Sequence, residues 1–296
     1  LITIGGQTGD YPIYGALCNM GAGEHWRVAE DGAYVDTYDH LTKIFECPDY
    51  FFFEKMAQNS TCSHSYYEEW NVELPMSNLY VAQQMHKRVP HNSIMNFAIL
   101  NSLRCWSYFP LDPSIQGYGN VAAFGIDGCN SMLIGESMNT DELCFIVTGD
   151  LAFFYDMNAL GIRHIKNNVR VLLIINGGGA EFKIMTRNWA EKVSVDNFIS
   201  ANGHNGSAKG WAENCGFTYI GVNTKEEVNN AIEGFTSVSD KPILMEVFTK
   251  EEDEVLAMVT FVRTNAITTA GGKLRQIVGN VVGNKGIEIL KKVIKR

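Results

Sequence analysis

Two short apolar runs with a helical segment between them dominate the hydrophobic pattern of this chain. The runs are Leu143–Thr148 and Val169–Ile175, and each has the uniform apolar character of a strand that is buried on both faces. Between them, apolar residues recur at helical spacing over Leu151–His164. A strand, a helix and a second strand in this order predict a right-handed crossover, which makes the two strands parallel.

The hydrophobic pattern predicts further strands and helices before and after this unit. Ser77 is a candidate helix N-cap, and Thr224 with Glu227 forms a capping box. Strands that alternate with helices favour an α/β fold built on a doubly wound, mostly parallel sheet. The other predicted strands are Ser93–Leu100, Gly119–Phe124, Phe217–Val222 and Pro242–Val247, and the other helices are Ser77–Arg88, Arg104–Phe109, Asp127–Met138, Ser207–Cys215 and Thr224–Phe235.

Three parts of the chain differ in their patterns. Residues 1–74 contain short strands and then, from Phe51, a helix followed by an exposed linker. Residues 75–250 carry the alternating strands and helices and form the main domain. Residues 251–296 are predicted to be a helical extension, broken at Gly271-Gly272 and at Gly279. We expect no targeting segment before the first strand.

Polar residues follow both strands of the central unit. Asp150 follows the first strand, and Asn176 follows the second. Neighbouring parallel strands lie about 4.8 Å apart and end at the same edge of the sheet, so two hard oxygen donors are expected to converge there. A third can come from a backbone carbonyl of the glycine turn, residues 177–179. This donor set suits Mg²⁺, which usually shares its coordination shell with phosphates.

A phosphate has a natural place beside such a metal ion. The N–H groups that open the helix after Asp150 would face an anion, at the strand ends where open α/β sheets bind ligands. The residues alone leave two alternatives open. One is a structural βαβ unit in which Asp150 is an ordinary N-cap, and the other is a nucleotide bound at the Gly149 turn. The nucleotide is disfavoured because Asn176, not an acidic ribose ligand, ends the next strand.

A long polar stretch, Ala180–Gly206, follows the glycine turn, and we interpret it as an irregular wall or lid over the site. Glu181 is the candidate acid or base in this stretch, because it comes soon after the glycines. His204 has no partner that the sequence reveals, so we interpret it as a surface residue.

Composition narrows the class of protein. The 296 residues are 46% hydrophobic, which is enough for substantial cores. The formal net charge of −9 argues against nucleic acid or an anionic membrane surface as partner, and no apolar run reaches the ~18 residues of a membrane span. Seven scattered cysteines without a CxxC pair indicate a reducing cytoplasm, and the dispersed histidines argue against a zinc site.

The central motif resembles a known cofactor-binding motif. Gly149-Asp150, a helix, and a hydrophobic strand ending in Asn176-Gly177-Gly178 resemble the thiamine-diphosphate motif of the 2-oxo-acid decarboxylase and acetolactate-synthase superfamily. The resemblance is strongest over about Ser77–Val247 and implies the C-terminal part of such an enzyme, with thiamine diphosphate and Mg²⁺ as cofactors. The residues that resemble the family of 2-succinyl-5-enolpyruvyl-6-hydroxy-3-cyclohexene-1-carboxylate synthases of the menaquinone pathway are Gly125–Gly128, Gly149–Leu151, Asp156–Leu160, Gly178-Gly179 and Phe182.

The resemblance implies roles for particular residues. Asp150, the Asn176 side chain and the Gly178 carbonyl would hold the metal ion. Ile126 would be the apolar wedge that bends the cofactor. The glutamate that activates the cofactor lies in a different, pyrimidine-binding domain in this superfamily, usually in another subunit, and that domain is not in this chain. The implied cofactor-binding residues are Asn101, Ser102, Ile126, Gly149, Asp150, Leu151, Asn176, Gly178 and Phe182, of which Asn101 and Ser102 would contact the diphosphate.

The resemblance also implies an activity, namely the decarboxylation of a 2-oxo acid followed by protonation of the product or its transfer to an acceptor substrate. The enzyme would be a cytoplasmic homodimer or homotetramer. Residues 1–74 would be the remnant of a central Rossmann-like domain plus a linker. Two positions depart from the pattern, since Val121 replaces an arginine that contacts the acceptor and Ile175 replaces the first of two asparagines. We therefore expect an altered acceptor site and a chain that is inactive alone. The alternative is a non-catalytic cofactor-binding or structural subunit.

Overall fold

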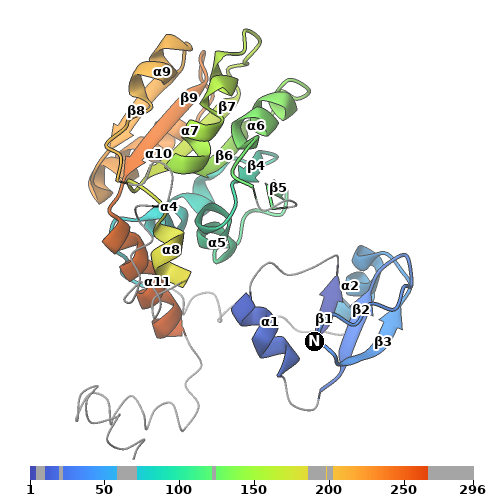
Figure 1. The fold of residues 1–296 in the computed structure, drawn as a ribbon. Helices are drawn as coiled ribbons and strands as arrows, with labels where there is room; N and C mark the ends of the chain where they lie inside the picture. Colours follow the sequence, from blue (N-terminus) through green and yellow to red (C-terminus); the bar gives the residue numbers. More distant parts are fainter. Residues whose placement is uncertain are drawn as a thin grey trace, which may run out of the picture. The chain divides into compact units, whose positions relative to one another are not determined.

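The computed structural model describes residues 1–4, 11–19, 23–58, 72–121, 125–185, 198 and 203–265 (Figure 1). These divide into two compact units, Leu1–Glu69 and Trp70–Arg296. The predicted linker residues 59–71 and the predicted breaks at Gly271-Gly272 and Gly279 lie outside the described residues. Among the described helices, none combines the length and apolar character that crossing a membrane requires.

In its described residues, the first unit is a small parallel sheet with two helices. Its strands are β1 (Ile2–Ile4), β2 (His25–Val28) and β3 (Leu41–Phe45), in that order, and its helices are α1 (Tyr11–Cys18) and α2 (Asp49–Ala57). Rings from β2, β3 and α2 form its apolar centre, because Phe45 lies 5.4 Å from Trp26 and 4.9 Å from Phe52 between ring centroids. Its origin in a Rossmann-like domain stays a prediction.

The second unit is built on a six-stranded sheet in which every pairing is parallel, so the expectation of an α/β fold with a parallel sheet is confirmed. The two central strands are neighbours, as predicted, with Cys144 opposite Val169 and Gly149 opposite Ile174. The strand order is β5-β4-β6-β7-β9-β8, and the strands are β4 (Ile94–Phe97), β5 (Gln116–Gly119), β6 (Cys144–Gly149), β7 (Val169–Ile175), β8 (Thr218–Val222) and β9 (Ile243–Phe248).

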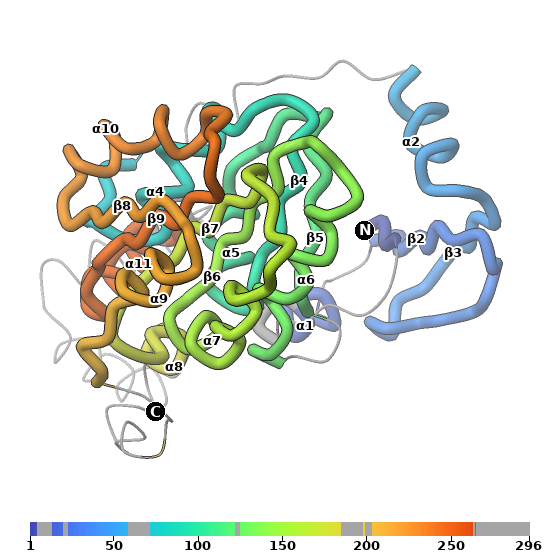
Figure 2. Tube along the Cα trace, turned by 90° about the horizontal axis from the view of Figure 1, so that it is seen from above, coloured from blue at the N-terminus to red at the C-terminus, as the bar shows by residue number. Residues whose placement is uncertain are grey.

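Helices cover both faces of this sheet, because alternate residues of the buried strands feed two separate cores. Leu172 and Ile174 belong to the core that packs against α4, α5, α10 and α11, whereas Val171 and Leu173 belong to the core under α6, α7 and α9. Figure 2 shows α10 and α7 on opposite sides of the sheet. The helices are α4 (Asn78–Met85), α5 (Asn101–Ser107), α6 (Cys129–Ser137), α7 (Asp150–Tyr155), α8 (Ala180–Met185), α9 (Lys209–Asn214), α10 (Lys225–Thr236) and α11 (Glu251–Asn265), and short 3₁₀ helices span His86–Arg88 and Met157–Gly161.

Both predicted caps are present. The Ser77 side chain accepts a hydrogen bond from the Tyr80 backbone N–H at the start of α4. At the start of α10, the Thr224 hydroxyl accepts from the Glu227 N–H while the Glu227 carboxylate accepts from the Thr224 N–H.

Several sequence-based expectations differ from the structure, and α5 begins three residues before the expected helix start at Arg104. The helix expected over Leu151–His164 is two pieces, because the chain leaves helical geometry at Asp156, whose carboxylate accepts from the backbone and hydroxyl of Ser131. The strand expected at Gly119–Phe124 lies earlier, at β5, and residues 122–124 are outside the described part. All four β5 residues are exposed at a sheet edge, so no hydrophobic pattern marks this strand. The stretch expected to be irregular from Ala180 opens with α8.

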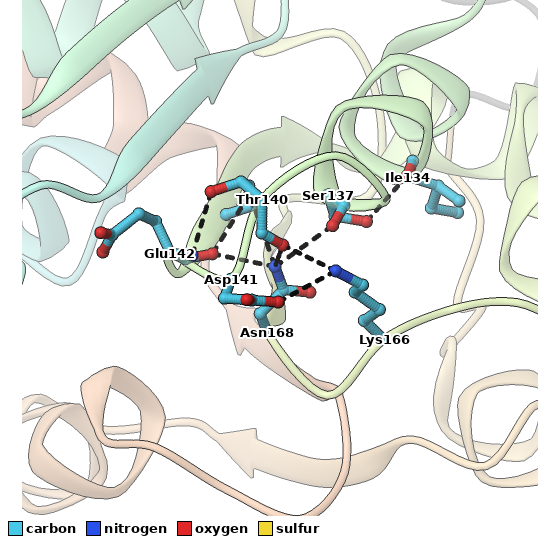
Figure 3. A network of polar contacts seen from close by, with 8 residues as sticks. Ile134, Ser137, Thr140, Asp141, Glu142, Lys166 and Asn168 are labelled. Carbon is cyan, nitrogen blue, oxygen red and sulfur yellow. Dashed lines mark hydrogen bonds and ion pairs between the residues drawn. The ribbon is translucent and has the colours of Figure 1, made fainter.

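Polar contacts connect the loops at the amino ends of the strands of the same sheet (Figure 3). The amide of Asn168, just before β7, donates to the carbonyls of Ser137, Thr140 and Glu142, which joins the end of α6 to the start of β6. Lys166 donates to the carbonyl of Thr140 and to the carboxylate of Asp141. The loops at this edge are therefore tied to one another, and the carboxyl edge carries the predicted site.

A buried arginine fixes the end of α10 to the start of β7. Arg170 is fully buried, and its guanidinium donates to the carbonyls of Phe235 and Ser237 at 2.9 and 2.5 Å. The same group donates to the carbonyls of Asn167 and Val169 at 2.7 and 2.9 Å. Burial lowers the pKa of Arg170 to about 10, and hydrogen bonds to four carbonyls compensate in part for the lost hydration.

We expect Arg170→Met to lower the free energy of unfolding of the second unit by about 2–4 kcal/mol, because methionine fills the space but leaves buried carbonyls without a donor. Urea unfolding followed by tryptophan fluorescence measures the change. Arg163→Met is the control, since Arg163 is exposed, and should stay within about 0.5 kcal/mol of the wild type. Equal stability of the two variants would contradict the structural role of Arg170.

Candidate functional site

The carboxylate of Asp150 joins the tips of β6 and β7. Asp150 is 2% exposed, and its Oδ1 accepts a hydrogen bond from the Leu151 N–H at 2.8 Å. Its Oδ2 accepts from the backbone N–H groups of Asn176 and Gly177 at 3.1 and 2.9 Å. The predicted convergence of Asp150 and Asn176 is therefore present, although it is the Asn176 backbone that touches the carboxylate.

The glycine turn after β7 has a backbone conformation that favours glycine. Gly177 has φ +84°, a conformation that side chains disfavour. The turn brings the Gly178 N–H to the Asn176 Oδ1 at 3.1 Å, and this contact holds the amide oxygen at the tip of the strand. Asp150, Asn176 and Gly178 thus lie within one short stretch of the carboxyl edge.

This donor set fits a hard divalent cation. Burial raises the pKa of Asp150, while the Leu151 N–H, His204 and the two turn amides act in the opposite direction. A nearby cation would favour the charged form of such a carboxylate. Among the described residues, no three acidic, histidine or cysteine side chains form a metal cluster. A metal here would therefore rely on one carboxylate, amide or carbonyl oxygens and the oxygens of a ligand, which is the usual setting of Mg²⁺.

His204 is not the surface residue that the sequence indicated. Its side chain is 17% exposed, and its Nε2 lies 3.2 Å from Asp150 Oδ2. The ring packs edge-on against Phe154, with centroids 5.3 Å apart and planes at 89°. His204 lies in a polar loop, 54 residues after Asp150. A contact over this distance leaves no periodic signal in the sequence, so the hydrophobic pattern could not predict it.

The strand-to-helix turn after β4 carries the predicted diphosphate contacts. Leu100 has φ +66° and ψ −121°, which is strained for a residue other than glycine, and this sharp turn lets α5 begin at Asn101. Ser102 is buried in the first turn of α5. The Asn101 carbonyl accepts from the Asn78 side chain at 3.2 Å. Backbone strain of this kind persists where the surrounding structure enforces it, often at binding sites.

Glu181, the candidate acid or base, is engaged in an ion pair. The Arg104 Nη1 donates to Glu181 Oε2 at 2.5 Å and to Asn101 Oδ1 at 2.9 Å. The side chains of Arg104 and Glu181 are 20% and 12% exposed. A carboxylate in this arrangement orients Arg104 and, through it, Asn101. A role for Arg104 was not predicted from the sequence, where its only signal is its place three residues after Asn101.

The turn that carries Ile126 has a glycine on each side, and at Gly128 the backbone conformation itself favours glycine. A Cβ at Gly125 would lie 2.1 Å from Asp127 Oδ1, and Gly128 has φ +71° at the start of α6. The Asn120 amide donates to the Asp127 carbonyl at 3.0 Å and ties the turn to the end of β5. The Ile126 side chain is 37% exposed, and such exposure leaves it open to a ligand.

The remaining predicted residues lie on the elements next to Asp150. A Cβ at Gly149 would meet no atom within 4 Å, so there is open space at this strand end. Leu151 is half-buried in α7, and Phe182 is 43% exposed on α8. The structure thus places the predicted residues on α5, on the turn before α6, at the β6–α7 junction, on the turn that leads into α8 and on α8 itself.

A second buried acid, Glu254 on α11, supports this edge. Its Oε1 accepts from the Asn78 N–H at 2.9 Å and from the Thr249 hydroxyl at 2.8 Å. Glu254 is 4% exposed, and burial raises its pKa to about 7, with the charges of Asp150 and Asp253 acting in the same direction. Because Asn78 also bonds the Asn101 carbonyl, Glu254 acts on the strained turn through one residue.

Three curated proteins with sequences similar to this chain carry the same name. The 2-succinyl-5-enolpyruvyl-6-hydroxy-3-cyclohexene-1-carboxylate synthase of Phocaeicola vulgatus is 35% identical over 268 residues, which are 86% of this chain and 48% of that protein. The synthase of Bacteroides thetaiotaomicron is 33% identical over 265 residues, 86% of this chain and 47% of that protein. That of Christiangramia forsetii is 35% identical over 192 residues, 64% of this chain and 33% of that protein.

The resemblance to these synthases is confirmed. The chain spans about half the length of the curated synthases of P. vulgatus and B. thetaiotaomicron that it matches. No family model matches the chain.

We expect the stability of the second unit to depend on pH through Glu254. Its folded-state pKa lies above the ordinary value of 4.5, so its stabilising contribution is complete below pH 4.5 and is lost as the pH rises through about 7. Glu254→Gln should remove this loss, which amounts to about 3 kcal/mol. Urea unfolding at a series of pH values, with Glu252→Gln on the exposed side of α11 as control, measures it. The same pH dependence in wild type and Glu254→Gln would contradict the assignment.

Proposed function

We propose that this chain is the C-terminal, metal- and diphosphate-binding part of a thiamine-diphosphate-dependent enzyme. The proposed reaction is the decarboxylation of a 2-oxo acid, with protonation of the product or its transfer to an acceptor substrate. Similarity to the synthases over 86% of the chain supports the enzyme class. The parallel sheet with helices on both faces supports a doubly wound thiamine-diphosphate-binding fold.

One observation carries the proposal, namely the buried Asp150 carboxylate at the tip of β6, held by the turn that follows β7. Oδ2 receives both turn amides, while Oδ1 receives one N–H group. Oδ1 therefore keeps a lone pair for a cation. The Asn176 amide oxygen and the Gly178 carbonyl complete the proposed protein ligands, and the diphosphate would supply further oxygens.

The other residues of the site have roles that follow from their positions. Asn101 and Ser102 would contact the diphosphate from the start of α5, where Arg104 holds the Asn101 side chain. Ile126 would support the bent cofactor from its rigid turn, with Gly149, Leu151 and Phe182 around it. When bound, thiamine diphosphate supplies the electron sink for the loss of CO₂ from a 2-oxo acid. The chain itself binds, orients and shields the reacting groups.

The site proposed here is half of a complete one. The activating glutamate would come from a pyrimidine-binding domain, so we expect this chain to bind the metal and diphosphate end of the cofactor but to be inactive alone. A homodimer or homotetramer in the cytoplasm would bring the two halves together. Val121, which is 37% exposed after β5, stands where the resemblance implies an arginine, and this favours an acceptor without the usual carboxylate contact.

We expect calorimetric titration of thiamine diphosphate into the full-length gene product to show heat that requires Mg²⁺. Asp150→Asn should abolish this heat, because the amide keeps the shape of the side chain but lacks the charge that holds the cation. Asp141→Asn is the control, since Asp141 lies fully exposed before the start of β6. Turnover of a 2-oxo acid would then separate the enzyme from a non-catalytic cofactor-binding subunit.

Equal Mg²⁺-dependent heat in wild type and Asp150→Asn would contradict the proposed metal site. Absence of binding by the wild-type gene product would contradict the cofactor itself and leave a structural role.

A further inference from the structure

A short loop at residues 203–206 rests directly on the glycine turn. The Gly203 N–H donates to the Gly177 carbonyl at 2.7 Å. The His204 carbonyl lies 3.5 Å from the place where a Cβ of Gly177 would be. Gly203 itself has φ +73°, which permits the sharp bend at this point. The loop and the turn are therefore in backbone contact immediately beside Asp150.

The hydrogen bonds of the His204 ring determine which nitrogen carries the proton. Nδ1 accepts from the Gly206 N–H at 3.0 Å, so in the neutral ring the hydrogen is on Nε2. Nε2 is buried and faces Asp150 Oδ2 at 3.2 Å, without the alignment of a regular hydrogen bond. The contact with the carboxylate is thus mainly electrostatic, and it opposes the rise that burial causes in the pKa of Asp150.

The surroundings hold the ring in this orientation. Phe154 packs against one side of it. A Cβ at Gly206 would lie 3.2 Å from His204 Nδ1, which is tighter than ordinary packing, and 3.4 Å from Phe154 Cζ. Glycine at position 206 thus allows the backbone to approach closely enough to bond Nδ1. Residues that contact a metal-binding carboxylate help to fix its orientation, and a ring held by both a hydrogen bond and an aromatic contact is fixed well enough to do so.

We propose that His204 is a positioning residue for the metal-binding carboxylate of Asp150. Together with the two turn amides, it holds Oδ2 on the protein side and leaves Oδ1 to face the cation. His204 acts through Asp150 and does not itself bind the metal ion. This inference rests on the proposed function, because it requires a divalent cation at Asp150.

The test uses Mn²⁺ as a spectroscopic substitute for Mg²⁺, titrated into the full-length gene product in the presence of thiamine diphosphate and followed by electron paramagnetic resonance. His204→Ala should weaken Mn²⁺ binding about 10–100-fold, the usual effect of losing a residue that orients a ligand. His204→Gln should restore much of the affinity, because its amide nitrogen can reach the position of Nε2. His91→Ala, a change at an exposed histidine outside the site, should bind as the wild type does.

The melting temperature of each metal-free variant distinguishes positioning from general stability. It should change little between His204→Ala and His204→Gln, although their metal affinities differ. Wild-type affinity in His204→Ala would overturn the inference while leaving the proposed function intact. The inference would also be overturned if both variants bound Mn²⁺ equally weakly and had a lowered melting temperature. Nitrogen coupling from an imidazole bound directly to Mn²⁺ would overturn it as well. No Mn²⁺ binding by the wild type would overturn the proposed function and this inference together.

Discussion

The carboxyl edge of the sheet depends on one contact. The carboxylate at the end of β6 accepts hydrogen bonds from backbone N–H groups of the turn that follows β7. Parallel strands cannot be joined by a tight hairpin, so their ends come together through side chains and loops. Asp150 provides that connection, since Oδ2 binds the amides of Asn176 and Gly177. The position of the turn, and with it the placement of the Asn176 and Gly178 oxygens, follows from this carboxylate.

Two buried acids share this edge, and the structure accommodates them differently. Asp150 is surrounded by N–H donors and by His204, which favour its ionised form against the effect of burial. Glu254 accepts two hydrogen bonds and has a pKa of about 7, so a large fraction of it carries a proton near neutral pH. Keeping the second acid partly neutral limits the repulsion between the two groups. The edge can thus hold a negative charge at the place where a cation would neutralise it.

Sequence analysis located the features that depend on regular patterns and neighbouring strands. The β6–α7–β7 unit and the meeting of Asp150 with the Asn176 turn follow from apolar runs and parallel pairing, and both are present. The exposed edge strand β5 has no apolar pattern, so the prediction shifted it toward the apolar residues after it. The contacts of His204 with Asp150 and of Arg104 with Glu181 join segments 54 and 77 residues apart, and no local rule predicts such pairs. The roles of the predicted cofactor residues remain predictions.

The shared guanidinium of Arg104 has a consequence for how ligands would bind. One nitrogen, Nη1, bonds both Asn101 at the start of α5 and Glu181 on α8. The first position faces the diphosphate end of the proposed site, and the second lies in the segment that leaves the metal turn. If a ligand at either segment favours this hydrogen-bonded arrangement, binding there would favour binding at the other, and by thermodynamic reciprocity the gain in affinity would be equal in both directions. Metal ion and diphosphate would then bind with positive cooperativity, and the Arg104 side chain would couple the two sites.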